Sequence, residues 1–94
     1  MTSDDARIAA DIRTLLDVRA PDASICPSEV ARRLSPEDAW RDAMPDVRRV
    51  AVALAADGVI RITQSDVVLD PEVPISGPIR LRRGPRWNDD TPID

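Results

Sequence analysis

The residues of this chain that are best suited to chemistry are its arginines and one cysteine. All thirteen basic side chains are arginine, and the sequence contains no lysine and no histidine. Arginine presents parallel N–H groups to a phosphate or a carboxylate, so it suits the recognition of anions. The lack of histidine removes the commonest general base and the usual hydrolytic triads, and it excludes a Cys/His zinc site. We therefore expect a binding protein with no enzymatic activity, cofactor or metal.

Five polar side chains are candidates for contacts with nucleic acid. The segment 45–57 repeats apolar residues at the i, i+3, i+4, i+7 spacing of a helix with one buried face. In a helix-turn-helix protein this helix would enter the major groove, and the hairpin expected at 59–70 would lie beside the DNA backbone. The side chains placed to contact phosphates or guanine edges are then Arg41, Arg48, Arg49, Arg61 and Ser28.

The same arginines can also be explained as solvated side chains paired with acids. The net charge is -4, and Asp42, Asp46 and Asp66 lie among the arginines. Surface ion pairs of this kind contribute about 0–1 kcal/mol and imply no function. An uninterrupted arginine face would favour duplex DNA as the partner. A face interrupted by these acids would favour a protein-interaction adaptor that binds no nucleic acid, and the sequence leaves both open.

Cys26 lies directly before Pro27, where a helix is expected to begin. A thiolate at a helix N-terminus is stabilised by the helix dipole, which would make Cys26 a reactive thiol or a redox sensor. Cys26 can also be a small buried residue at a turn, with Ser28 and Glu29 satisfying the open amides of the helix. The second interpretation is favoured, because the chain has no second cysteine and no histidine to support thiol chemistry.

Apolar periodicity predicts three main helices, at residues 4–19, 27–34 and 45–57. A short extra helix should begin at Ser35 and end near Met44. Pro45 would then take the first position of the third main helix, a position that proline favours. Trp40, within the short helix, is expected to pack on the core rather than to bind a ligand.

A hairpin is predicted directly after the third helix. The β-prone runs 59–63 and 67–69 flank a polar turn at 64–66. Ile25 is expected to pair with this hairpin as a short strand. Residues 79–82 alternate apolar and basic side chains, so they either add a third strand or lie along the hairpin edge.

The order of these elements predicts an α+β fold, a winged helix-turn-helix with three main helices, a short extra helix and a two- or three-stranded β wing. Residues 1–83 should form a single domain, and 84–94 a polar tail that we expect to be poorly ordered. Trp87, in that tail, either anchors a partner chain or packs back onto the domain. If the module acts on operator DNA, a homodimer through the helix at 4–19 is expected, because one such module buries little surface.

The sequence predicts a cytoplasmic protein. No apolar run approaches the length of a transmembrane helix, and the first residues do not resemble a signal peptide. We therefore expect no contact with membranes. The single cysteine also excludes an intrachain disulfide.

Several short blocks along residues 8–83 form a recognisable pattern. They are Ile25-Cys26-Pro27-Ser28-Glu29-Val30-Ala31-Arg32, Trp40-Arg41, Met44-Pro45-Asp46-Val47-Arg48, Gly58 with Ile60, Thr63-Gln64, Asp70-Pro71 and Gly77-Pro78-Ile79-Arg80-Leu81. In this order and spacing they resemble the bacterial family known as domain of unknown function 3253. The resemblance implies a winged-helix-like fold but no catalytic or binding residues, because no biochemical role is assigned to the family. One departure is Ser65-Asp66, at a hairpin turn where members usually have glycine.

Overall fold

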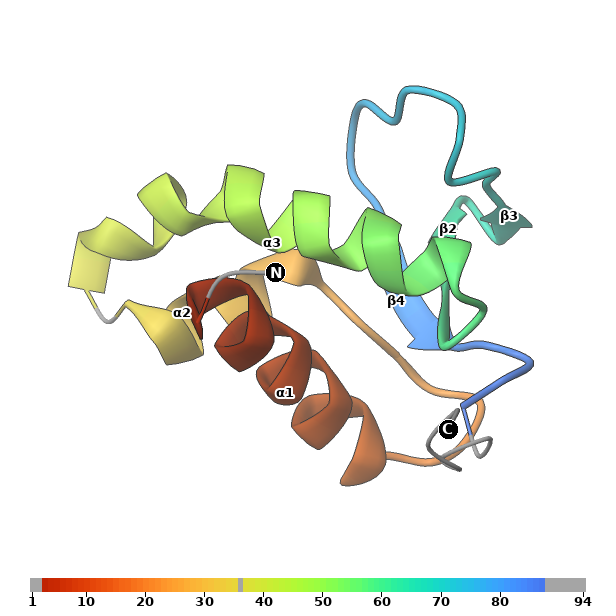
Figure 1. The fold of residues 1–94 in the computed structure, drawn as a ribbon, viewed down its shortest axis with the longest axis horizontal. Coiled ribbons are helices and arrows are strands. Elements are labelled where there is room, and N and C mark those ends of the chain that lie inside the picture. Colours follow the sequence, from red (N-terminus) through yellow and green to blue (C-terminus); the bar gives the residue numbers. More distant parts are fainter. Residues whose placement is uncertain (1–2, 36, 88–94) are drawn as a thin grey trace.

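Three helices pack against one another and against one face of a small antiparallel sheet (Figure 1). The structure is a computed structural model that describes residues 3–35 and 37–87. In chain order its elements are α1 (Ser3–Asp17), β1 (Ser24–Ile25), α2 (Pro27–Leu34), the 3-10 helix η1 (Glu37–Ala39), α3 (Trp40–Ala56), β2 (Ile60–Gln64), β3 (Val67–Val68) and β4 (Arg80–Arg83). The α+β class expected from the sequence is confirmed.

The sheet has the strand order β1-β4-β2-β3, and every neighbouring pair is antiparallel. Leu81 of β4 faces Ile25 on one side and Ile62 on the other, so β4 joins strands that are far apart in the sequence. Of the two arrangements expected for residues 79–82, the third strand is therefore confirmed. The expected pairing of Ile25 with the hairpin is wrong, because β4 occupies the free side of β2 and takes β1 as its other neighbour.

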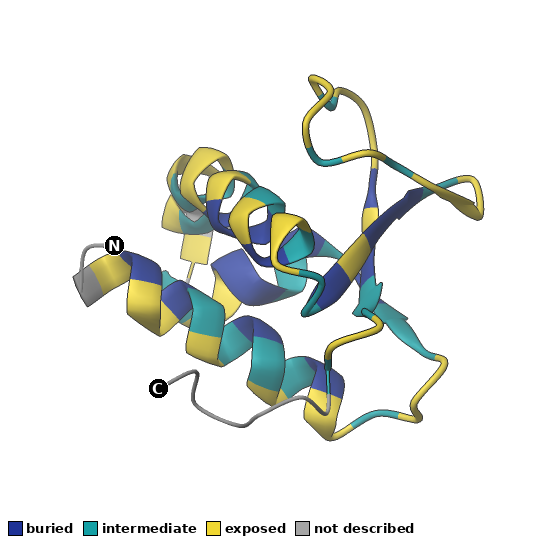
Figure 2. Ribbon diagram, turned by 45° about the vertical axis from the view of Figure 1, so that its right-hand side comes forward, coloured by how far each residue is buried: buried dark blue, intermediate teal, exposed yellow. Residues whose placement is uncertain are grey.

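The core is made of aliphatic side chains, since the sequence contains no phenylalanine and no tyrosine. The buried faces of the helices turn toward one another and toward the sheet (Figure 2). The buried apolar side chains are Ile8, Ile12, Leu16, Ile25, Val30, Ala31, Val47, Val50, Ala51, Leu54, Ile60, Ile62, Ile79 and Leu81. The apolar stripe of α1 is thus used in the core of its own chain, and dimerisation through that helix stays a prediction.

The third helix is longer than the sequence indicates. The short helix and the separate start at Pro45 are wrong, because α3 runs without a break from Trp40 and contains Pro45. A proline inside a helix removes a backbone hydrogen bond and costs about 3 kcal/mol. Packing offsets this cost, since Trp40 and Met44 contact the core in line with the buried Val47. The expectation that Trp40 packs on the core is confirmed.

The hairpin turn is one residue shorter than predicted. Gln64 and Val67 pair as the last residues of their strands, and only Ser65 and Asp66 connect them. These two residues have φ angles of 50° and 66°. Two successive left-handed residues form the tight turns that match the twist of a hairpin. Aspartate tolerates this conformation better than most residues, so the turn closes without glycine.

Residues 84–87 are packed onto the domain. The amide of Gly84 donates a hydrogen bond to the carbonyl of Val59 (2.9 Å), and Trp87 packs against the hydrophobic core. Of the two alternatives for Trp87, packing onto the domain is therefore the one observed. Of the segment 84–94 expected to be a tail, 88–94 lies outside the described residues, and its ordering stays a prediction.

Gly84→Ala should destabilise the domain, because Gly84 lies where two backbone segments meet. A Cβ atom there would meet the carbonyl oxygen of Gly58 and lie 2.8 Å from the backbone of Ile60. We expect the free energy of unfolding to fall by about 1–3 kcal/mol, measured by urea denaturation with circular dichroism. The control Ser76→Ala, at an exposed loop position, should change it by less than about 0.5 kcal/mol. Equal stability of the two variants would contradict the close approach.

Candidate functional site

The five side chains proposed for nucleic-acid contact do not share one set of neighbours. Arg49 binds a carboxylate of α1, Arg48 binds the loop between β3 and β4, and Arg41 lies over a tryptophan ring. Arg61 is exposed on β2, and the hydroxyl of Ser28 is bonded within the first turn of α2. Two of these groups, Arg48 and Arg49, therefore join separate elements of the same chain.

A two-pronged ion pair joins Arg49 on α3 to Asp5 on α1. Two guanidinium nitrogens donate to the two carboxylate oxygens, each at 2.6 Å. The Asp5 side chain is only 8% exposed, and Asp46 lies 3.3 Å from the same guanidinium. The hydrogen bonds to Asp5, followed by that to Asp46, raise the pKa of Arg49 above its usual value. Because a nearly buried carboxylate needs a partner, Arg49 is held by the fold.

Arg48 turns toward the loop between β3 and β4. Its guanidinium donates to the carbonyl oxygen of Gly77 at 2.7 Å. Gln64, at the end of β2, donates to the neighbouring carbonyls of Ser76 and Pro78 at 2.7 and 3.1 Å. These bonds hold the end of the loop against α3 and β2, so Arg48 positions a segment of its own chain.

Each of the two tryptophans lies beside two guanidinium groups. The pairs are Arg41 and Arg32 with Trp40, at 4.7 and 4.6 Å from the ring centre, and Arg83 and Arg13 with Trp87, at 5.1 and 5.7 Å. The ring faces carry partial negative charge, which attracts the guanidinium cations. Arg41 therefore has a structural contact within the region where DNA contacts were proposed.

Acids lie beside Arg49 on the outward side of α3. At 3.6 residues per turn, Asp42, Asp46 and Arg49 fall on one side of the helix, opposite the buried Val47. Asp46 is already bonded to Arg49. Acids therefore interrupt the surface around Arg49.

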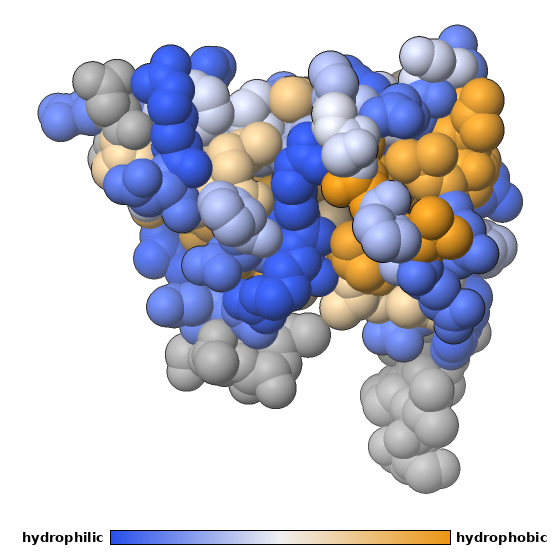
Figure 3. Space-filling view, turned by 90° about the horizontal axis from the view of Figure 1, so that it is seen from above, coloured by the Kyte–Doolittle hydropathy of each residue, from blue (hydrophilic) through white to orange (hydrophobic). Residues whose placement is uncertain are grey.

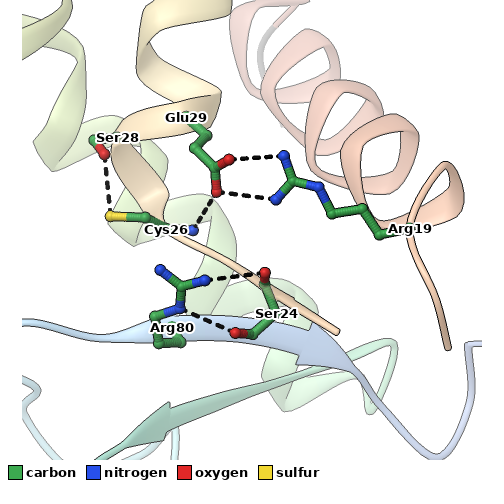
Figure 4. A network of polar contacts seen from close by, with 6 residues as sticks. All are labelled: Arg19, Ser24, Cys26, Ser28, Glu29 and Arg80. Atoms are coloured by element: carbon green, nitrogen blue, oxygen red, sulfur yellow. Dashed lines mark hydrogen bonds and ion pairs between the residues drawn. The ribbon is translucent and has the colours of Figure 1, made fainter. Parts of the chain in front are cut away.

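Polar groups also gather at the first turn of α2 (Figure 4). Glu29 accepts hydrogen bonds from the amide of Cys26 (2.7 Å) and from two nitrogens of Arg19 (2.7 and 3.2 Å). The bond from Arg19 is the main cause that lowers the pKa of Glu29, and the amide of Cys26 adds to it. The hydroxyl of Ser28 donates to the sulfur of Cys26 at 3.0 Å. These contacts fit the structural interpretation of Cys26 as a small, half-buried residue at a turn.

Arg83 on β4 binds the C-terminal end of α1. One guanidinium nitrogen donates to the carbonyls of Leu16 (2.9 Å) and Arg19 (3.0 Å). The last carbonyls of a helix lack partners within it and carry partial negative charge, so a cation is favourable there. The contact fits an end of α1 at Asp17, two residues before the predicted end.

Sequence reasoning missed the partners of these arginines. Arg49 and Asp5 are separated by 44 residues, and no local pattern links two such positions. By contrast, the bond between Glu29 and the amide of Cys26 has the three-residue spacing of a capping box, which is visible in the sequence. The missed contacts are thus the long-range ones.

Two classes of site are not found in the described part of the chain. Residues 3–35 and 37–87 contain no cluster of three or more side chains that could hold a metal ion. No helix among them combines the length and the apolarity needed to cross a membrane. The observations define a small α+β domain in which many arginines hold the elements together.

Comparison with protein families places the chain within one of them. Residues 5–84 match the model described as "Protein of unknown function (DUF3253)", and the chain belongs to this family. The match confirms the resemblance carried by the sequence blocks. A comparison with curated proteins gave no match.

Asp5→Ala should lower the free energy of unfolding by about 1–3 kcal/mol, because it removes a charged hydrogen-bond partner that links two helices. Arg49→Ala should also destabilise the domain, since it strips a nearly buried carboxylate of its main partner. The double variant should lose much less than the sum of the two losses. Arg7→Ala, at an exposed position of α1, serves as the control. Additive losses in urea denaturation would show that the pair is not coupled.

Glu29→Gln should make the free energy of unfolding depend less on pH in the acid range. The pKa of Glu29 is lowered from 4.5 in the folded domain. Its ionised form therefore stabilises the fold above that value, and the contribution is lost as the pH falls through the lower folded pKa. At pH 7 the variant should unfold about 3–5 °C below the unmodified chain, and this gap should shrink below pH 4.5. A gap that stays constant over this pH range would argue against the ion pair, and the control Glu72→Gln, at an exposed position, should unfold close to the unmodified chain at pH 7.

Proposed function

We propose that this domain is a winged-helix adaptor that binds a partner protein through its wing and does not bind nucleic acid. The wing is the segment 65–79 between β2 and β4, and it contains β3. The order α1-β1-α2-α3-β2-wing-β4, with β4 paired between β1 and β2, supports the winged-helix assignment (Figure 1). In this arrangement α3 corresponds to the recognition helix of helix-turn-helix proteins.

The composition and exposure of the wing carry this proposal. It contains three carboxylates, from Asp66, Asp70 and Glu72, and no basic residue. Val67, Val68 and Val73 are 61%, 58% and 56% exposed. Figure 3 shows apolar side chains gathered at the end of the molecule where the wing lies. A shallow depression of ≈ 250 Å³ opens there, lined by Gln64, Val68, Leu69, Asp70, Val73, Pro74, Ile75 and Ser76.

A protein surface suits this wing better than a DNA backbone does. The carboxylates of the wing would be repelled by phosphates, and its valines would gain little from contact with them. Burying the same valines against a partner protein removes apolar area from water, which stabilises the complex by about 25 cal/mol per Å² of buried area. Contiguous apolar patches on a soluble domain commonly mark such contact sites. The acids beside Arg49 on α3 add to the case against DNA.

Titration with random-sequence duplex DNA tests the exclusion of nucleic acid. We expect no binding at about 50 mM salt, because binding to DNA depends on releasing counterions from several phosphates. Fluorescence anisotropy of a labelled duplex would report the outcome. Micromolar affinity that weakens steeply as salt is raised would overturn the proposal and restore duplex DNA as the partner.

Substitution of the exposed valines tests the wing itself. In quantitative capture from cells that naturally express the chain, Val68→Ser with Val73→Ser should reduce recovery of a bound protein by about tenfold, the effect of roughly 1.4 kcal/mol. The matched control is Val18→Ser, whose side chain is 74% exposed at the end of α1. Neither change alters charge. Recovery that is equal for the wing variant and the control would exclude the wing as the contact surface.

A further inference from the structure

The face of the sheet that is turned away from the helices carries three arginines. Side chains alternate between the two faces of a strand. Ile62 and Leu81 are buried on the helix side, so Arg61, Arg80 and Arg82 lie on the other face. We call these three residues the basic face.

The register of the sheet brings the basic face together. Arg61 of β2 lies directly opposite Arg82 of β4, and Arg80 follows two residues before Arg82 on the same strand. Directly opposed residues in an antiparallel pair have Cβ atoms about 4.5–5.5 Å apart, and like charges at that distance destabilise the sheet. A chain with net charge -4 thus keeps three cations side by side.

Hydrogen bonds hold the guanidinium groups of Arg80 and Arg82 without neutralising their charge. Arg80 donates to the hydroxyl and the carbonyl oxygen of Ser24 at 3.0 and 3.1 Å, and Arg82 donates to the carbonyl of Asp22 at 2.9 Å. These acceptors are uncharged. The carboxylate of Asp66 lies 3.7 Å from Arg82, but its side chain is 94% exposed and such a pair contributes little. Each guanidinium has five N–H donors, so both groups keep donors for a ligand.

Other groups around the basic face leave room for an anion. Glu29 is close enough for Arg80 to help lower its pKa, but its oxygens are engaged by Arg19 and the amide of Cys26. A depression of ≈ 380 Å³ adjoins Arg80, lined by Thr63, Gln64, Ser65, Pro78, Ile79 and Arg80. Arg80 is therefore held in place beside open space.

We propose that the basic face binds a short, carboxylate-rich segment of a partner protein. In an extended peptide, alternate side chains point the same way and repeat about every 7 Å. Arg80 and Arg82 have the same repeat along β4, so alternate carboxylates of such a segment would meet them in turn, and Arg61 would flank the second. Carboxylates suit arginine because they accept two parallel N–H bonds.

A long polyanion fits this face less well than a short acidic segment. The wing projects from the same sheet and carries three carboxylates. These carboxylates would repel the phosphates of a long duplex that lay along the basic face. A short segment on β4 would meet fewer of these carboxylates than a long duplex would, although Asp66 of the wing lies 3.7 Å from Arg82. The basic face adjoins the wing, because Val68 lies opposite Thr63 and Thr63 lies opposite Arg80. It consists of residues other than the wing valines, so substitutions of its arginines test it apart from them.

Fluorescence anisotropy with a labelled peptide of alternating glutamate and threonine tests this inference at about 50 mM salt, where surface charges are only partly screened. We expect saturable binding, absent for a peptide of alternating lysine and threonine. Arg61→Gln and Arg82→Gln should each weaken it by about threefold to tenfold, because each removes one charge-assisted contact. Arg7→Gln, an exposed arginine on α1, removes the same charge and should change affinity by less than about twofold.

Three outcomes would overturn the inference. The first is an absence of saturable binding to the glutamate peptide, which leaves the wing proposal intact. The second is equal weakening by Arg7→Gln and Arg61→Gln, which would mean that only the overall charge matters. The third is tighter binding of duplex DNA than of the peptide, lost in Arg61→Gln, which would assign the basic face to nucleic acid and overturn the wing proposal as well. Arg61→Gln should unfold at the same temperature as the unmodified chain or slightly above it, because it relieves the repulsion from Arg82, and this separates lost binding from lost fold.

Discussion

The fold depends on the pairing of β4 between β1 and β2. Leu81 at its centre is fully buried and faces both neighbouring strands. In the same strand Arg83 binds the end of α1, and Gly84, which follows it, continues the hydrogen bonding to Val59. The four residues of β4 thus fix the end of α1 and the base of the hairpin. Through their pairing with β1 they also fix the start of α2. Both the wing and the basic face take their positions from this strand.

Local patterns in the sequence predict most of the elements but not their long-range partners. The apolar repeats of α1, α2 and α3 and the alternation in β2 follow from short-range spacing, and all appear in the structure. The start of α3 could not be predicted, because packing of Trp40 on the core outweighs the break that Pro45 suggests locally. The candidate arginines were the least predictable part. Their spacing shows which side of a helix they occupy, but a partner such as Asp5, 44 residues from Arg49, is set by how the helices pack.

The arginines of this domain divide between two uses. Arg48, Arg49 and Arg83 bind groups of their own chain and join helices to the loop and the sheet. Arg61 and Arg82 place positive charge on the outer face of the sheet, with Arg82 paired weakly to Asp66, while the wing concentrates carboxylates and valines. Opposite charges are therefore segregated onto neighbouring surfaces, which suits an adaptor that orients a partner by charge and holds it by apolar contact.

The placement of the two tryptophans gives the domain two separate optical reporters. Because the chain has no tyrosine and no phenylalanine, its aromatic absorption and emission come from Trp40 and Trp87. The Trp40 ring lies against guanidinium groups of α2 and α3, and the Trp87 ring lies against those of α1 and β4. A chain that retains only one of them would report on one end of the fold alone. Trp40 would then report on the contact between α2 and α3, and Trp87 on the contact between α1 and β4.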